Sequence, residues 1–162
     1  MLRMTKQTDY GFVLLTRLAV EPGKAMNAPD LAGETKLPLP MVSKILKLLV
    51  RQGLLASHRG VKGGYALARP AAEIHAAEIL RALEGAVALT VCVEGSPGEC
   101  DREHFCTVRG PWQRINKAVF EALAGVTLAE LAGETAPRLV KIGSGISGTR
   151  TRIDAGSRVE SH

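Results

Sequence analysis

The sequence lacks any long uncharged apolar run, and this absence excludes a membrane-spanning helix. Its first residues lack an apolar core followed by a small-residue cleavage site, so we expect no signal peptide and a cytosolic protein. No pairing of a nucleophile with a base is evident, because the histidines are scattered along the chain. The sequence therefore predicts a protein that is not an enzyme.

Cysteine is scarce. The three cysteines of the chain, Cys92, Cys100 and Cys106, all lie in the stretch CVEGSPGECDREHFC. An odd number of cysteines cannot form a complete disulfide framework. Structural zinc sites usually have cysteine pairs two to four residues apart. Here the gaps are seven and five residues. Gaps of this width favour a larger group, an iron–sulfur cluster bound by thiolates.

Three sulfur atoms leave one ligand of such a cluster to a carboxylate, a histidine or water. A Cys3His zinc site through His104 is an alternative, although His104 lies only two residues before Cys106. Unliganded thiols in a flexible loop are a further alternative, but such thiols would be prone to oxidation. The local candidates for the fourth ligand are Glu94, Glu99, Asp101, Glu103 and His104.

Acidic residues are few in the first part of the chain. Residues 1–70 contain eleven Lys and Arg against four Asp and Glu, a net charge of +7. Residues 71–162 contain ten against twelve, a net charge of −2. This asymmetry indicates that the basic first part binds a polyanion and that the second part has a different role. A merely solvated basic face is the alternative.

The basic part predicts a helix-turn-helix. A first helix over TDYGFVLLTRLAV begins near Thr8 or Asp9, and a second begins after the N-cap Asn27. A third helix runs from about Pro40 to Gly53. Its apolar residues follow a helical period and should face the core: Val42, Ile45, Leu46 and Leu49. Its polar side should face DNA in the major groove, with the candidate contacts Ser43, Lys44, Lys47 and Arg51.

A β-hairpin is predicted directly after these helices, with strands at 54–58 and 65–68 around a glycine-rich turn. Arg59 and Lys62 stand at its tip, where they can contact phosphates or a narrow minor groove. A nucleotide-binding loop is not expected, because no Gly-Lys-Ser/Thr ending is present and no helix follows. A basic hairpin in this position is typical of a winged helix.

The later chain contains a helix over EIHAAEILRALEG, the cysteine stretch and a long apolar-periodic helix. A continuous apolar stripe on so small a chain indicates pairing with a second copy, or else packing on the chain's own domain. Thr127 and Glu130 have the spacing of a capping box, and a Gly-, Ser- and Arg-rich tail follows from Gly143. The stripe is expected to contain Trp112, Ile115, Val119, Leu123 and Val126.

The predicted fold class is mainly α: a winged helix-turn-helix with a small β-hairpin wing, plus a long dimerisation helix. We expect the DNA-binding domain over 1–70 and a connecting helix with the cysteine loop over 71–110. The dimerisation helix and a short terminal helix should occupy 111–133, and a disordered tail should occupy 134–162.

RGVKGGYALARP in the wing, followed by three cysteines before a long helix, resembles the IscR/NsrR/RirA family of bacterial transcriptional regulators. The resemblance covers about residues 1–133, and MTKQTDYG with VRGPWQRIN is most similar to the branch that regulates SUF iron–sulfur assembly genes. It implies a homodimer that binds a palindromic operator in double-stranded DNA, with neither a membrane nor a small-molecule substrate as partner. It also implies a labile 2Fe–2S or 4Fe–4S cluster that controls repression.

By the same resemblance, Cys92, Cys100 and Cys106 are the cluster ligands and Arg59 is the wing contact. The IscR branch has a histidine three residues after the last cysteine, where this chain has Arg109. The NsrR branch uses an acid in the first helix of the partner subunit, and Asp9 matches that position. Asp9 is thus the favoured fourth ligand, with N-capping as its alternative role. A regulator whose cysteines form a zinc or thiol redox site without a cluster is the alternative function.

Overall fold

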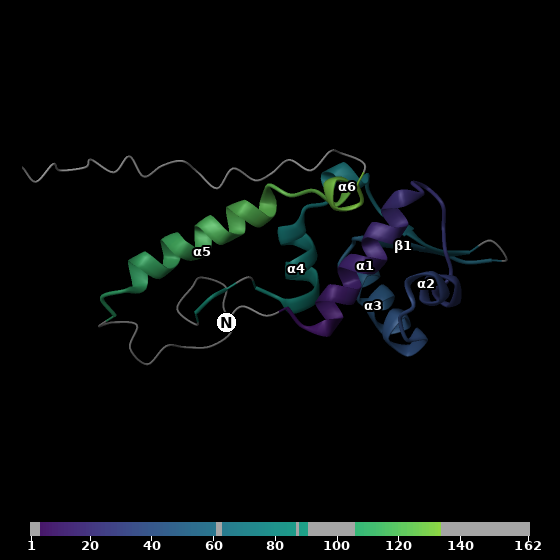
Figure 1. Cartoon of the computed structure of the whole chain (residues 1–162), viewed down its shortest axis with the longest axis horizontal. Helices are drawn as coiled ribbons and strands as arrows, with labels where there is room; N and C mark the ends of the chain where they lie inside the picture. The colour runs from purple at the N-terminus through teal and green to yellow at the C-terminus, as the bar shows by residue number, and fades with distance from the viewer. Residues whose placement is uncertain (1–3, 61–62, 87, 91–105, 134–162) are drawn as a thin grey trace, which may run out of the picture.

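The computed structural model describes residues 4–60, 63–86, 88–90 and 106–133 (Figure 1). It confirms the mainly helical fold with one antiparallel hairpin. Within the described ranges, no helix is long and apolar enough to cross a membrane. The predicted tail over 134–162 lies outside these ranges. The elements are α1 Lys6–Val20, α2 Ala28–Thr35, α3 Leu39–Arg51, β1 Leu55–His58, β2 Gly64–Leu67, the 3-10 helix η1 Ala71–Glu73, α4 Ala76–Glu84, α5 Arg109–Ala124 and α6 Leu128–Leu131.

The first helix of the helix-turn-helix, α2, begins and ends at residues with clear capping roles. Asn27 caps α2, as predicted, because its side chain accepts a hydrogen bond of 2.8 Å from the Asp30 amide. Lys36, with φ of 58°, ends α2 in the left-handed conformation and turns the chain toward α3. The first helix differs from the prediction: α1 begins at Lys6 and its N-cap is Thr5, not Thr8 or Asp9.

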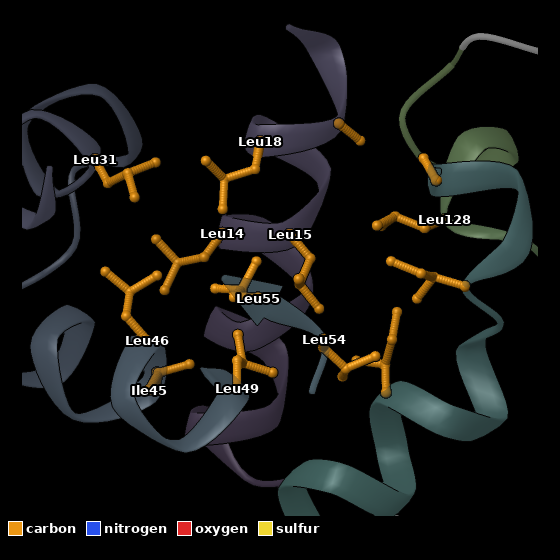
Figure 2. Close-up of a cluster of buried hydrophobic side chains, with 14 of the residues drawn as sticks. Leu14, Leu15, Leu18, Leu31, Ile45, Leu46, Leu49, Leu54, Leu55 and Leu128 are labelled. Carbon is orange, nitrogen blue, oxygen red and sulfur yellow. The ribbon is translucent and has the colours of Figure 1, made fainter. Parts of the chain in front are cut away.

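One apolar core joins the helices (Figure 2). Leu14 and Leu15 of α1 lie against Ile45, Leu46 and Leu49 of α3, and all five side chains are fully buried. The predicted core face of α3 is therefore confirmed. The same core extends beyond residue 70 to the later helices, through Ile74, Ile79, Leu83 and Leu128.

The wing is a short antiparallel pair in which Ala56 lies opposite Ala66. Tyr65 joins its base to the segment before α2, because the amides and carbonyls of Tyr65 and Met26 exchange hydrogen bonds of 2.8 and 3.0 Å. Gly64 permits this approach, since a Cβ atom there would lie 2.6 Å from the Met26 carbonyl. The wing is thus fixed to the helix-turn-helix at one end.

The chain leaves this core after α4 and returns to it through α6. The Leu128 amide donates to the Ile74 carbonyl at 2.7 Å, and the Ala76 amide donates to the Val126 carbonyl at 2.9 Å. Thr127 and Glu130 form the predicted capping box. Val126 lies after the end of α5, so it is not part of the helical stripe in which it was placed. Figure 1 shows α5 extending away from α1, α2 and α3, with α4 and α6 near its C-terminal end.

Candidate DNA-binding surface and cofactor site

The outer face of α3 carries unpaired positive charge. Lys44, Lys47 and Arg51 are exposed on the side opposite the buried leucines, as the periodicity predicted. None of the three forms an ion pair with another described residue. Ser43 is half-buried at the edge of this face. Such a surface can bind a chain of phosphates without first breaking internal ion pairs.

The wing tip adds a further positive charge beside the helix-turn-helix. Arg59 is exposed directly after β1, and Lys62 lies outside the described residues. The turn depends on Gly63, whose amide donates to the Gly60 carbonyl at 2.9 Å. A Cβ atom at Gly63 would lie 2.4 Å from the His58 carbonyl oxygen, so a larger residue would distort the turn.

Arg17 of α1 joins α1 to α2 through its guanidinium group. It contacts the Glu34 carboxylate of α2 and lies 3.0 Å from Glu21, which also contacts Lys24. Hydrogen bonds from Lys24 and from Arg17 lower the pKa of the Glu21 carboxyl. Sequence reasoning missed this network, although Arg17 and Glu21 have the i, i+4 spacing of a helical ion pair.

Asp9 is exposed on the first turns of α1, and the capping role proposed as its alternative is wrong. The cap is Thr5, whose hydroxyl oxygen accepts from the Thr8 amide at 3.2 Å. No hydrogen bond or ion pair joins the Asp9 carboxylate to another described residue. Its carboxylate is therefore available to a ligand.

Glu84 at the end of α4 joins the start of α1 in what we term the Glu84 cluster, made of Thr5, Thr8 and Glu84. The carboxylate accepts from the Thr5 amide at 3.1 Å and from the Thr5 hydroxyl at 2.7 Å. It also accepts from the fully buried Thr8 hydroxyl. These bonds, led by that from Thr8, lower the pKa of Glu84. No local signal predicts the cluster, because Thr5 and Glu84 are 79 residues apart.

The segment just before the cysteine stretch is joined to α5 by a hydrogen bond. Asn116, only 9% exposed, accepts a hydrogen bond of 3.0 Å from the Leu89 amide. Leu89 lies three residues before Cys92, so this hydrogen bond joins α5 to the chain just before the cysteine stretch. Sequence reasoning missed Asn116, a polar residue in an apolar-periodic helix.

Of the three predicted cysteine ligands, only Cys106 falls within the described residues; Cys92 and Cys100 fall outside them. Cys106 is a half-buried free thiol that precedes α5. In the described part of the chain, no three His, Cys, Asp or Glu side chains gather as a metal site. Cys106 and Asp9 nevertheless have the donor chemistry of an iron–sulfur site: a free thiol and a carboxylate without another partner. The fourth-ligand candidates Glu94, Glu99, Asp101, Glu103 and His104 also lie outside the described residues.

The helix α5 exposes large apolar side chains. Trp112 is 37% exposed and Ile115 is 46% exposed, whereas Val119 and Leu123 of the predicted stripe are half-buried. Phe120, outside that stripe, is 41% exposed. Packing on the chain's own domain thus covers only part of this helix.

Comparisons with known proteins agree on one family. The family model Rrf2, described as an iron-dependent transcriptional regulator, matches residues 4–134. Protein aau3 of Rhizobium meliloti is 32% identical over 130 residues, which cover 80% of this chain and 84% of that protein. CymR, the global cysteine regulator of B. subtilis, has a TM-score of 0.68 at 30% identity, covering 84% of this chain and all of CymR. T. potens IscR has a TM-score of 0.63 at 27% identity, covering 82% and 88%.

Proposed function

Because the chain belongs to the Rrf2 family of iron-dependent transcriptional regulators, we propose that it is a dimeric repressor whose operator affinity is controlled by a labile iron–sulfur cluster. Members of this family are transcriptional regulators and not enzymes. The observation that carries the proposal is the exposed, unpaired basic face of α3 in a chain whose Asp9 carboxylate is also unpaired. The similarity to SUF regulators makes iron–sulfur assembly or iron and redox-stress genes the expected targets.

DNA binding follows from the placement of charge. We infer that α3 lies in the major groove with Lys44, Lys47 and Arg51 toward phosphates and base edges, and Ser43 beside them. Arg59 and Lys62 of the wing would contact the backbone or the adjacent minor groove. Affinity should therefore fall steeply as salt rises. Replacing Lys47 by Ala should weaken binding to all sequences and reduce the slope of log affinity against log salt by about one.

Dimerisation is supported by the exposed apolar side chains of α5. Burying Trp112, Ile115 and Phe120 against the same helix of a second copy would remove from water the apolar surface that the chain's own domain leaves uncovered. A two-fold dimer places two α3 helices for a palindromic operator with half-sites about one helical turn apart.

The cofactor would be held by residues from both protomers. Cys92, Cys100 and Cys106 of one chain would supply thiolates, and the partner's Asp9 would supply a carboxylate. Figure 1 shows α1 and the start of α5 well apart within one chain, which supports an Asp9 ligand from the second chain. An iron–sulfur cluster would supply sensitivity to oxidants, nitric oxide and iron or cluster supply.

Shared ligation explains how operator affinity could change. With both protomers bound to one group, the cysteine loop of one chain and α1 of the other keep a fixed separation. Because α1 packs on α3, this separation determines the spacing of the two recognition helices. The change in operator affinity is limited by the difference in the free energy of cluster binding between the two arrangements of the dimer.

The test is anaerobic purification followed by the absorption spectrum, assays of iron and acid-labile sulfide, and operator binding by holo and apo dimers. We expect charge-transfer bands, matched iron and sulfide, and different operator affinities. Asp9→Asn should shorten the lifetime of the chromophore under oxygen. Asp30 is an exposed acid in the first turn of α2, and the control substitution Asp30→Asn should leave this lifetime unchanged. Equal affinities of the two forms would refute the control by the cluster.

A second candidate function is regulation through a zinc or thiol site without a cluster. The likeness to CymR, a global cysteine regulator, favours it. A colourless protein with zinc, or with no metal after anaerobic reconstitution, would establish this alternative and leave the DNA-binding surface unchanged.

A further inference from the structure

The first turn of α3 carries no side chain that forms strong hydrogen bonds. It consists of Pro38 as N-cap followed by Leu39, Pro40 and Met41. The amides of Met41 and Val42 both donate to the Pro38 carbonyl at 3.0 Å, so these two backbone donors are used. Proline has no amide hydrogen, so Pro40 adds no donor. The turn therefore cannot bind guanine, adenine or cytosine edges as Arg, Asn, Gln or acidic side chains do.

Leu39 is the apolar group that this turn leaves open. It is 42% exposed, whereas Met41 is half-buried against the core. Leu39 lies one helical turn before Ser43 on the same side of α3. Among the exposed large apolar side chains of the described residues, it is the only one on α3. Isolated apolar side chains are common on protein surfaces, so exposure alone does not indicate a contact. Leu39 differs because it lies at the end of the helix that contacts bases in a helix-turn-helix.

We propose that Leu39 is a specificity-determining residue that contacts the C5-methyl group of a thymine in each operator half-site. The proposal rests on the proposed function, in which α3 lies in the major groove. Thymine is the base whose major-groove edge offers an apolar group, and a leucine side chain matches that group. The contact removes apolar surface from water on both partners, as packing in a core does.

The test uses a duplex selected by the full-length protein from random DNA, with each thymine replaced in turn by deoxyuridine. This replacement removes only the methyl group. At one thymine in each half-site, we expect deoxyuridine to weaken binding about three- to fivefold. Leu39→Ala should weaken binding to the thymine duplex by a similar factor and should be insensitive to deoxyuridine at that position. The effect on the wild-type protein does not depend on the folding of any variant.

Leu131→Ala is the matched control, because Leu131 is 43% exposed but lies on α6. This variant should keep the full preference for thymine. Additive effects of Leu39→Ala and deoxyuridine at every position, or a selected half-site without thymine, would overturn the assignment. A separate failure is distinguishable: if Lys47→Ala leaves affinity and its salt dependence unchanged for all duplexes, the placement of α3 in the groove is wrong.

Discussion

Removing the Glu84 carboxylate should destabilise the fold by disconnecting the start of α1 from the end of α4. The substitution Glu84→Ala removes the acceptor of hydrogen bonds from the Thr5 amide, the Thr5 hydroxyl and the Thr8 hydroxyl. Hydrogen bonds to charged groups contribute about 1.5–3 kcal/mol when desolvated, but two of these three bonds are exposed to water. Thr8 can also donate to Thr5, 3.1 Å away. We therefore expect a loss of about 1–2 kcal/mol in the free energy of unfolding.

The assay is urea and thermal unfolding followed by circular dichroism. A loss of this size corresponds to a fall in melting temperature of about 3–8 °C for a folded unit of this length. Glu73→Ala is the control, because Glu73 is an exposed acid whose side chain has no partner among the described residues. It should change stability by less than about 0.5 kcal/mol.

The same cluster predicts a pH dependence. The folded pKa of Glu84 lies below its ordinary value of 4.5, so the stabilisation is fully present above about pH 4.5 and is lost as pH falls through the folded pKa. The difference in stability between the wild-type protein and Glu84→Gln should therefore narrow on acidification below pH 4.5. Equal stability of Glu84→Ala and Glu73→Ala at pH 7, or a difference that does not respond to acid, would refute the reasoning.

Two further predictions concern the wing and the cysteine segment. Gly63→Ala would place a Cβ atom 2.4 Å from a backbone carbonyl oxygen. Operator affinity should therefore fall, with little change in melting temperature. The control Gly33→Ala has open space around its Cβ atom and should bind DNA normally. Unchanged operator binding by Gly63→Ala would contradict this. Asn116→Ala should cost about 1 kcal/mol and speed hydrogen exchange at the Leu89 amide, whereas the exposed Gln113→Ala should do neither. Slow exchange at Leu89 in both variants would show that the bond is unimportant.

The basic outer face of α3 and the wing could be predicted because their signals are local. The buried and charged sides of α3 are encoded by residues three and four apart, and the wing follows from glycines beside alternating apolar residues. Asn27 and the Thr127–Glu130 pair identified two helix starts for the same reason, since each cap joins residues three apart.

The start of α1 was misplaced because two hydroxyl residues and one acid in its first turns all have capping chemistry. Thr5 is the N-cap, and its amide and hydroxyl also donate hydrogen bonds to Glu84 of α4. The full ligand set stays a prediction, because Cys92 and Cys100 lie outside the described residues and Asp9 would act through a second chain.

By itself, the sequence determined the order of the helices, the basic face of α3, the wing and the clustering of the cysteines, because each depends on neighbouring residues and residue type. Only the tertiary structure decided that Glu84 joins α4 to α1, that Asn116 holds Leu89, and that the first half of α5 leaves Trp112 and Ile115 in water. These contacts and exposures depend on the path of the chain, which brings together residues that no local pattern relates.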